Sequence, residues 1–135
     1  MADLSNPFSM RVYWEDTDAG GVVFYANYLK FFERARTEWL RALGIEQRAL
    51  QETTGSIFVV ADVALRYLAP AKLDDMLVVT VKVLEMGKAS IALEQQAWRG
   101  EVLLAQGTVR VGCVNSTSLR PCRIPVEVAS RLVVS

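Results

Sequence analysis

The alternation of hydrophobic and polar positions predicts one long helix and several strands. From Tyr28 to Leu43, apolar side chains recur every three or four residues, as in a helix with one buried face. Basic and acidic side chains fall on the opposite side. Gly44 follows, where a left-handed residue commonly ends a helix. The pattern therefore predicts an amphipathic helix whose apolar face must be covered by another element.

Strands are predicted wherever apolar residues alternate with polar ones at every second position. These segments are Ile57–Leu68, Met76–Met86, Ala89–Arg99 and Val102–Val114, with a shorter first strand over Phe8–Trp14. In the longest alternating run, the odd positions from Ile57 to Tyr67 are all apolar. Turns at Gly87–Lys88 and Gly100 are too short for a parallel crossover, so the strands that they join run antiparallel.

The remaining segments predict smaller elements. A short second helix is expected within Gly44–Gly55, a loop over Asn115–Pro125, and a closing helix or strand over Val126–Val134. One antiparallel sheet with the long helix on its apolar face satisfies these patterns, which is an α+β architecture. Its edge strands would stay open, and Phe58, Val60 and Leu68 add apolar surface, so self-association is expected.

Composition narrows the class of protein. The chain has 135 residues and is 52% hydrophobic, which predicts a single domain over 1–135 with a sizeable core. Basic and acidic residues number 15 each, so nothing in the charge attracts nucleic acid or an anionic membrane. No signal peptide or membrane-spanning stretch is evident. A cytoplasmic protein without a cofactor is expected.

The chain contains no histidine, which limits its chemistry. Histidine-dependent serine and cysteine nucleophiles are excluded, and zinc sites lose their commonest nitrogen ligand. Cys113 and Cys122 form neither a disulfide framework nor a metal pair, so both are interpreted as reduced bystanders. No metal site is predicted. Carboxylates must therefore carry any proton transfer.

An acidic turn with two glycines, Glu15–Gly21, precedes the long helix. It has two interpretations. Carboxylates are favoured near the positive end of a helix, so the turn can be a simple cap. Alternatively, free N–H groups at the helix start polarise an acyl carbonyl while a carboxylate attacks it or activates water.

The run from Glu15 to Arg36, EDTDAGGVVFYANYLKFFERAR, closely resembles the signature of hotdog-fold acyl-CoA thioesterases. The resemblance is to the 4-hydroxybenzoyl-CoA thioesterase family and its bacterial Tol-Pal-cluster branch. It extends more loosely to Tyr67–Asp75, YLAPAKLDD. The resemblance implies a hotdog fold, in which an antiparallel sheet wraps around one long helix, and an acyl-CoA substrate.

The resemblance also assigns residues. It selects Asp18 over Asp16 as the essential carboxylate, a choice that composition alone leaves open. Several members of the branch carry histidine where this chain has Tyr25, so the expected contribution of Tyr25 is its backbone N–H, which would polarise the thioester carbonyl. Asp18 would act as general base or as nucleophile.

Four further residues are predicted to contact substrate. Gly20 and Gly21 would let the acyl group approach the backbone. Asn27 either orients Asp18 or caps the helix. Lys88 resembles the basic position that family members use against coenzyme A phosphates, although an exposed lysine in a turn is commonly just solvated.

Arg36 interrupts the apolar face of the predicted helix. Its guanidinium either reaches solvent or pairs with Glu33 one turn earlier, or it forms an ion pair across a subunit interface.

The predicted function is hydrolysis of an acyl-CoA to the free acid and coenzyme A. The alternative is a binding module that holds acyl-CoA or an acyl carrier protein without turnover. Hotdog thioesterases are dimers, often paired into tetramers, so the resemblance implies a homodimer or homotetramer with substrate bound between subunits. The acyl group itself is left open.

Overall fold

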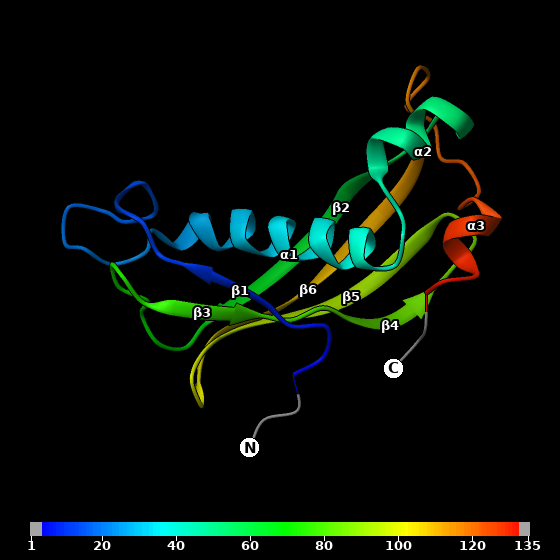
Figure 1. The fold of residues 1–135 in the computed structure, drawn as a ribbon. Coiled ribbons are helices and arrows are strands. Elements are labelled where there is room, and N and C mark those ends of the chain that lie inside the picture. The colour runs from blue at the N-terminus through cyan, green and yellow to red at the C-terminus, as the bar shows by residue number, and fades with distance from the viewer. Residues whose placement is uncertain (1–3, 133–135) are drawn as a thin grey trace.

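The computed structural model describes residues 4–132. One long helix, α1 (Tyr28–Ala42), lies across the face of an antiparallel sheet (Figure 1). A short 3-10 turn, η2 (Tyr25–Asn27), leads directly into it. The predicted helix is confirmed to within one residue at its end, because the three-four spacing of apolar positions reports the buried face directly.

The sheet contains six strands, and each paired strand runs antiparallel to its neighbour. The strands are β1 (Phe8–Arg11), β2 (Ser56–Tyr67), β3 (Met76–Val79), β4 (Lys82–Met86), β5 (Ser90–Arg99) and β6 (Val102–Asn115). Their order is β1-β3-β5-β6-β2, with β4 also pairing with β5. Strand β2 therefore ends the order and pairs with β6 on one side, and no strand within residues 4–132 pairs with its other edge.

Two strand predictions need correction. The segment predicted as one strand over Met76–Met86 is divided into β3 and β4, because the N–H of Val81 donates to the carbonyl of Ser5 at 3.1 Å instead of continuing the ladder. The first strand ends at Arg11, and Trp14–Asp16 forms a 3-10 turn, η1. Tertiary hydrogen bonds decided both boundaries.

The register of β2 shifts between Val60 and Asp62, which is a β-bulge or similar irregularity. An extra residue in one strand reverses the alternation of faces beyond it. As a result Phe58 at an even position and Leu65 at an odd position both pack against the core. The prediction that the odd positions share one face throughout this strand is therefore wrong.

The core lies between α1 and the sheet. Phe31, Phe32 and Ala35 on the helix are fully buried, as are Leu77 and Val79 on β3. Two small helices complete the fold: α2 (Gln47–Thr54), which ends at Gly55 in the left-handed conformation (φ 75°), and α3 (Val126–Ala129). Both were expected as short elements. The last residues of the predicted closing segment, 133 and 134, lie outside the described residues.

At Gly107, strand β6 lies too close to β2 to leave room for a side chain. A Cβ there would lie 2.3 Å from the carbonyl oxygen of Ala64 and from a methyl group of Leu65. We expect Gly107→Ala to lower the free energy of unfolding by about 1–3 kcal/mol, because overpacking forces the two strands apart. Gly112→Ala on the same strand is the matched control, since its nearest contact, 3.9 Å from Val59, is ordinary. Equal denaturation midpoints for the two variants would contradict this expectation.

Candidate active site at the start of the long helix

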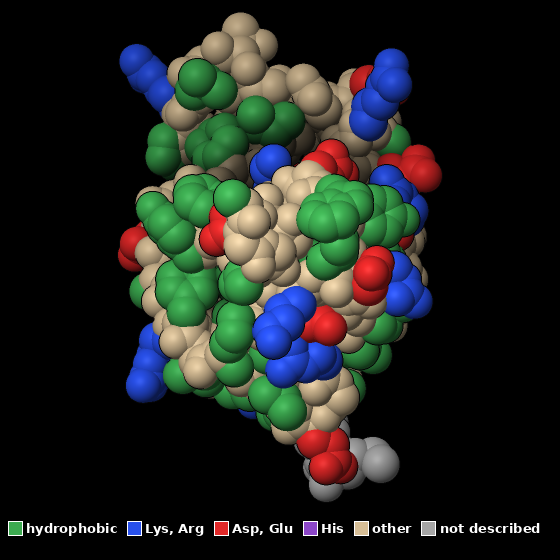
Figure 2. Space-filling view, turned by 90° about the vertical axis from the view of Figure 1, so that its left-hand side faces the viewer, with side chains coloured by type: hydrophobic (Ala, Val, Ile, Leu, Met, Phe, Trp, Pro, Cys, Tyr) green, Lys and Arg blue, Asp and Glu red, His purple; other side chains and the backbone are tan. Residues whose placement is uncertain are grey.

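The acidic loop and the start of the helical run meet at one end of the molecule. This end lies at the left of Figure 1 and faces the viewer in Figure 2. Figure 2 shows hydrophobic side chains gathered there, with acidic and basic groups among them. Several large side chains at this end are well exposed, among them Tyr13, Trp14, Phe24 and Tyr25. Exposed aromatic residues in such numbers are typical of a binding surface rather than of a structural end.

Asp18 is exposed and closes a tight turn. Its Oδ1 accepts hydrogen bonds from the N–H of Gly20 at 2.9 Å and from the N–H of Val22 at 3.4 Å. A Cβ on Gly20 would lie 3.3 Å from this oxygen, and Gly21 adopts the left-handed conformation at φ 76°. The two glycines therefore shape the turn that presents the Asp18 carboxylate, a role that sequence analysis had not assigned to them.

Asp16 has a different role. It is 3% exposed, and its two carboxylate oxygens accept from the side-chain amide of Asn27 and from the N–H of Tyr13, both at 2.9 Å. These hydrogen bonds link η1 to the segment that begins the long helix. Asp16 is thus a buried structural carboxylate, whereas Asp18 remains available to a ligand.

The side chain of Asn27 makes neither of the contacts that its two predicted roles would use. Its side-chain amide donates to Asp16 rather than to Asp18, and no side-chain hydrogen bond caps α1. Asn27 is buried at the junction of η2 and α1. The hydrogen bond from its amide to Asp16 instead fixes the acidic loop relative to the helix, because the other oxygen of Asp16 is bonded to the N–H of Tyr13.

The helical run begins with two free donors. Among the described residues, no oxygen accepts from the backbone N–H of Tyr25 or Ala26. The first N–H groups of a helical segment carry partial positive charge and point toward its open end. This arrangement suits a carbonyl oxygen that becomes negative during reaction. The Tyr25 side chain itself is 62% exposed and makes no hydrogen bond among the described residues.

A cavity of about 300 Å³ lies beside Tyr25. Its walls are apolar and aromatic: Val22, Val23, Tyr25, Tyr28, Tyr67, Leu68, Ala69 and Pro70. Asp18 does not line it, but the backbone N–H of Asp18 is bonded to Val22, which does. The cavity therefore adjoins the turn that carries Asp18 and is lined by Tyr25, whose N–H is free.

Tyr67 is a cavity residue that sequence analysis missed as functional. Its ring lies 6.0 Å from that of Tyr25 and 5.6 Å from that of Tyr28, measured between centroids. Burial raises the pKa of Tyr67 above its ordinary value, and Tyr25 adds to the effect. The sequence signal for such a role was the position of Tyr67 at the end of a predicted strand, three residues before Pro70.

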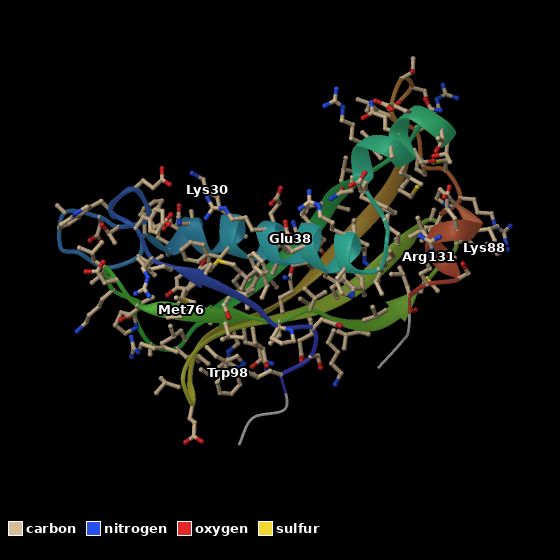
Figure 3. All side chains as sticks on the ribbon, in the orientation of Figure 1. Lys30, Glu38, Met76, Lys88, Trp98 and Arg131 are labelled. Carbon is tan, nitrogen blue, oxygen red and sulfur yellow. The ribbon has the colours of Figure 1, made fainter. Side chains whose placement is uncertain are left out.

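Lys88 does not reach this site within one chain. It lies in the turn between β4 and β5, at the opposite end of the molecule from the acidic loop (Figure 3). Its backbone carbonyl accepts from Ile124, so the turn is fixed at that end. Any contact between Lys88 and a ligand at the Asp18 loop requires a second copy of the chain.

A second hollow, the Arg36 groove, runs between α1 and strands β2, β5 and β6, with a volume of about 180 Å³. Arg36 lines it and donates to the side-chain carbonyl of Gln95 at 2.9 Å, while Gln95 donates to the backbone carbonyl of Phe32 at 3.0 Å. Burial lowers the pKa of Arg36, and nearby Glu33 opposes this shift. Within residues 4–132 Arg36 forms no ion pair, so the expected pairing with Glu33 is not present. The sequence held a signal for this role of Gln95, because Gln95 is a polar residue on the buried face of a predicted strand.

The role of Asp16 gives a stability prediction. Asp16→Asn replaces one accepting oxygen by an N–H₂ group that must face either the Asn27 amide or the Tyr13 N–H. We expect the free energy of unfolding to fall by about 1–3 kcal/mol, the cost of leaving a buried polar group unsatisfied. Chemical denaturation measures it, with Glu15→Gln at the exposed neighbouring position as control. A wild-type midpoint for Asp16→Asn would show that these bonds are dispensable.

No helix within the described part of the chain is long and apolar enough to cross a membrane.

Comparison with known proteins places this geometry in a family. Over 128 residues the chain is 48% identical to the acyl-CoA thioesterase YbgC of Haemophilus influenzae, covering 95% of this chain and 94% of that protein. It is 41% identical to the acyl-CoA thioester hydrolase YbgC of Escherichia coli over 90% of each chain. Among solved structures, a probable thioesterase from Bartonella henselae superposes with a TM-score of 0.83 at 34% identity, covering 88% of this chain and 98% of that one.

The sequence profile of the Thioesterase-like superfamily matches residues 12–132, which include the acidic loop, the helix and all strands except β1. The predicted hotdog fold is confirmed by the structural neighbours. Because this profile covers most of the chain and a named thioesterase is 48% identical to it, the chain belongs to the Thioesterase-like superfamily.

Proposed function

We propose that this protein hydrolyses the thioester bond of an acyl-CoA to give a free acid and coenzyme A. The observation that carries the proposal is the juxtaposition of the exposed Asp18 loop with the unbonded N–H groups that begin the helical run. The relatives named as acyl-CoA thioesterase and thioester hydrolase support the same chemistry.

In the proposed reaction, the thioester carbonyl oxygen lies against the N–H groups of Tyr25 and Ala26. These donors stabilise the negative charge that develops when the carbonyl carbon is attacked. Asp18 either removes a proton from the attacking water or attacks the carbon itself, giving an anhydride that water then cleaves. In both routes the C–S bond breaks, and the sulfur leaves as the thiolate of coenzyme A and takes up a proton.

We further propose that the active unit is a dimer formed through the open edge of β2. This edge carries the exposed apolar residues Val59, Val60, Val63 and Tyr67. An unpaired strand edge with apolar side chains readily pairs with another strand, and a two-fold axis makes such self-pairing antiparallel. The two sheets would then join into one.

Such pairing would complete the site. An antiparallel β2 pair sets the Tyr67 end of one strand beside the Ser56–Val59 end of the other. Tyr67 lines the cavity next to Tyr25, whereas Val59 lines the Arg36 groove. The cavity of one subunit would therefore adjoin the Arg36 groove of its partner, which provides a continuous path for an acyl group.

The same geometry gives Lys88 a role. Ser90 pairs with Gly112 and Gly112 with Val59, so the turn that carries Lys88 lies at the Ser56–Val59 end of the sheet. In the antiparallel dimer this end approaches the Tyr67 end of the partner. Lys88 would then meet the phosphates of a coenzyme A bound at the other subunit's Asp18 loop. Pairing of two dimers into a tetramer remains an expectation from the family.

The function is tested by measuring coenzyme A release from short aliphatic, long aliphatic and aromatic acyl-CoAs. We expect turnover of at least one of these substrates, with free acid formed in equal amount. Binding of acyl-CoA or of an acylated carrier protein without release across the whole panel would instead support a non-catalytic binding module.

A further inference from the structure

The two cysteines lie side by side although nine positions separate them in the chain. Their sulfur atoms are 3.5 Å apart, one on β6 and one in the segment that folds back along it. Val114 and Pro121 form an antiparallel bridge, and the N–H of Cys122 donates to the carbonyl of Cys113 at 2.9 Å. Cys113 and Cys122 therefore oppose each other directly across an antiparallel pair.

This arrangement suits a disulfide. Residues opposite each other in an antiparallel pair have Cα atoms about 4.5–5.5 Å apart. That range falls within the roughly 4.4–6.8 Å found between disulfide-bonded residues. The sulfur atoms need to approach by about 1.5 Å to reach the bond length of about 2.05 Å, a shift that side-chain rotation can supply without moving the backbone.

The two thiols differ in accessibility. Cys113 is 1% exposed, and burial together with its contact to Cys122 raises its pKa to about 11. Cys122 is only partly buried, and the Ser56 hydroxyl lies 3.6 Å from its sulfur. Because oxidants react with accessible thiolates, Cys122 is the thiol that a solvent-borne oxidant reaches first.

We propose that Cys113 and Cys122 are a modification site, a dithiol that a peroxide converts reversibly into an intrachain disulfide. The Cys122 thiolate attacks a peroxide oxygen, the O–O bond breaks, and hydroxide leaves, giving a sulfenic acid at Cys122. The Cys113 sulfur then attacks the Cys122 sulfur, the S–O bond breaks, and water leaves with the Cys113 proton. The two thiols together lose two electrons, which the peroxide gains.

The buried neighbour gives the pair a protective role. A sulfenic acid left alone is oxidised further to sulfinic acid, which is irreversible for most proteins. Cys113, already in contact with Cys122, intercepts that intermediate before a second peroxide molecule reacts. The disulfide also ties the segment around Cys122 to β6, next to Ser56 at the start of β2.

The test treats the reduced protein with hydrogen peroxide and follows free thiols and intact mass. We expect both thiols to disappear together, the mass to fall by about 2 Da for the two hydrogens lost, and a dithiol reductant to restore both. Non-reducing electrophoresis should show no crosslinked chains. This outcome does not depend on the proposed thioesterase activity.

Two variants separate the roles of the cysteines. In Cys122→Ser, the remaining Cys113 thiol should survive the same treatment, because it is buried. In Cys113→Ser, Cys122 should progress to the sulfinic acid, with a mass gain of about 32 Da. If Cys113→Ser does not fold, Cys113→Ala replaces it. The proposal would be overturned by sulfinic acid in the wild-type protein or by crosslinked chains. It would also be overturned if both wild-type thiols persisted under conditions that oxidise Cys122 in Cys113→Ser.

Discussion

Asp18→Asn is expected to lower the turnover of acyl-CoA by at least about two orders of magnitude. The substitution removes the negative charge and the basicity on which either proposed role of Asp18 depends, and general-base catalysis commonly contributes on this scale. Asparagine keeps an oxygen that can accept from the N–H groups of Gly20 and Val22, so the turn should be retained. Steady-state coenzyme A release and thermal melting of the same preparation measure both properties.

Asp74→Asn is the matched control for this variant. Asp74 is exposed and lies in a loop with a left-handed backbone (φ 72°), a conformation that asparagine tolerates. The turnover of Asp74→Asn should equal that of the wild-type protein. Near-normal turnover of Asp18→Asn, or a loss matched by a lower melting temperature, would reduce Asp18 to a structural turn residue.

Val63→Lys is expected to dissociate the dimer and to reduce turnover with it. Val63 lies near the middle of β2, so a two-fold axis through this edge brings the two copies of the residue close together. Two lysines placed against each other cost several kcal/mol at an interface, which weakens association by at least about a hundredfold. Lysine is also a residue that natural sheets use to keep edges unpaired.

Light scattering over a range of protein concentrations, with turnover measured at each, tests this result. Val102→Lys on β6 is the control, because Val102 is 46% exposed and Val63 is 39% exposed. The control should remain as associated and as active as the wild type. A Val63→Lys protein that stays dimeric would exclude the β2 edge as the interface, and a fully active monomer would exclude the shared site.

The long helix and the antiparallel sheet could be predicted from the sequence because their evidence is local. Periodicity of 3.6 or 2 residues reports which face of an element is buried, whatever covers that face. It does not report a β-bulge, so the faces of β2 were assigned incorrectly before Asp62. It also does not report the break at Val81, which depends on a hydrogen bond to the distant residue Ser5.

The candidate site shows the same division. The motif around Asp18 and the two glycines could be recognised as a functional turn, since its residues are contiguous in the chain. The resemblance selected Asp18 over Asp16, but no local pattern showed which of the two carboxylates is buried, because both are aspartates two positions apart. One is buried against Asn27, eleven positions away, and the other is exposed.

The sequence by itself determined the class of fold, the family and the absence of histidine chemistry, since each follows from local pattern or composition. Only the tertiary structure decided which carboxylate is exposed, that Gln95 holds Arg36, that Lys88 lies at the opposite end of the molecule from the acidic loop, and that the two cysteines touch. These facts depend on contacts between segments far apart in sequence. Such contacts are fixed by how the strands pair and how the helix packs on them, and no local periodicity encodes them.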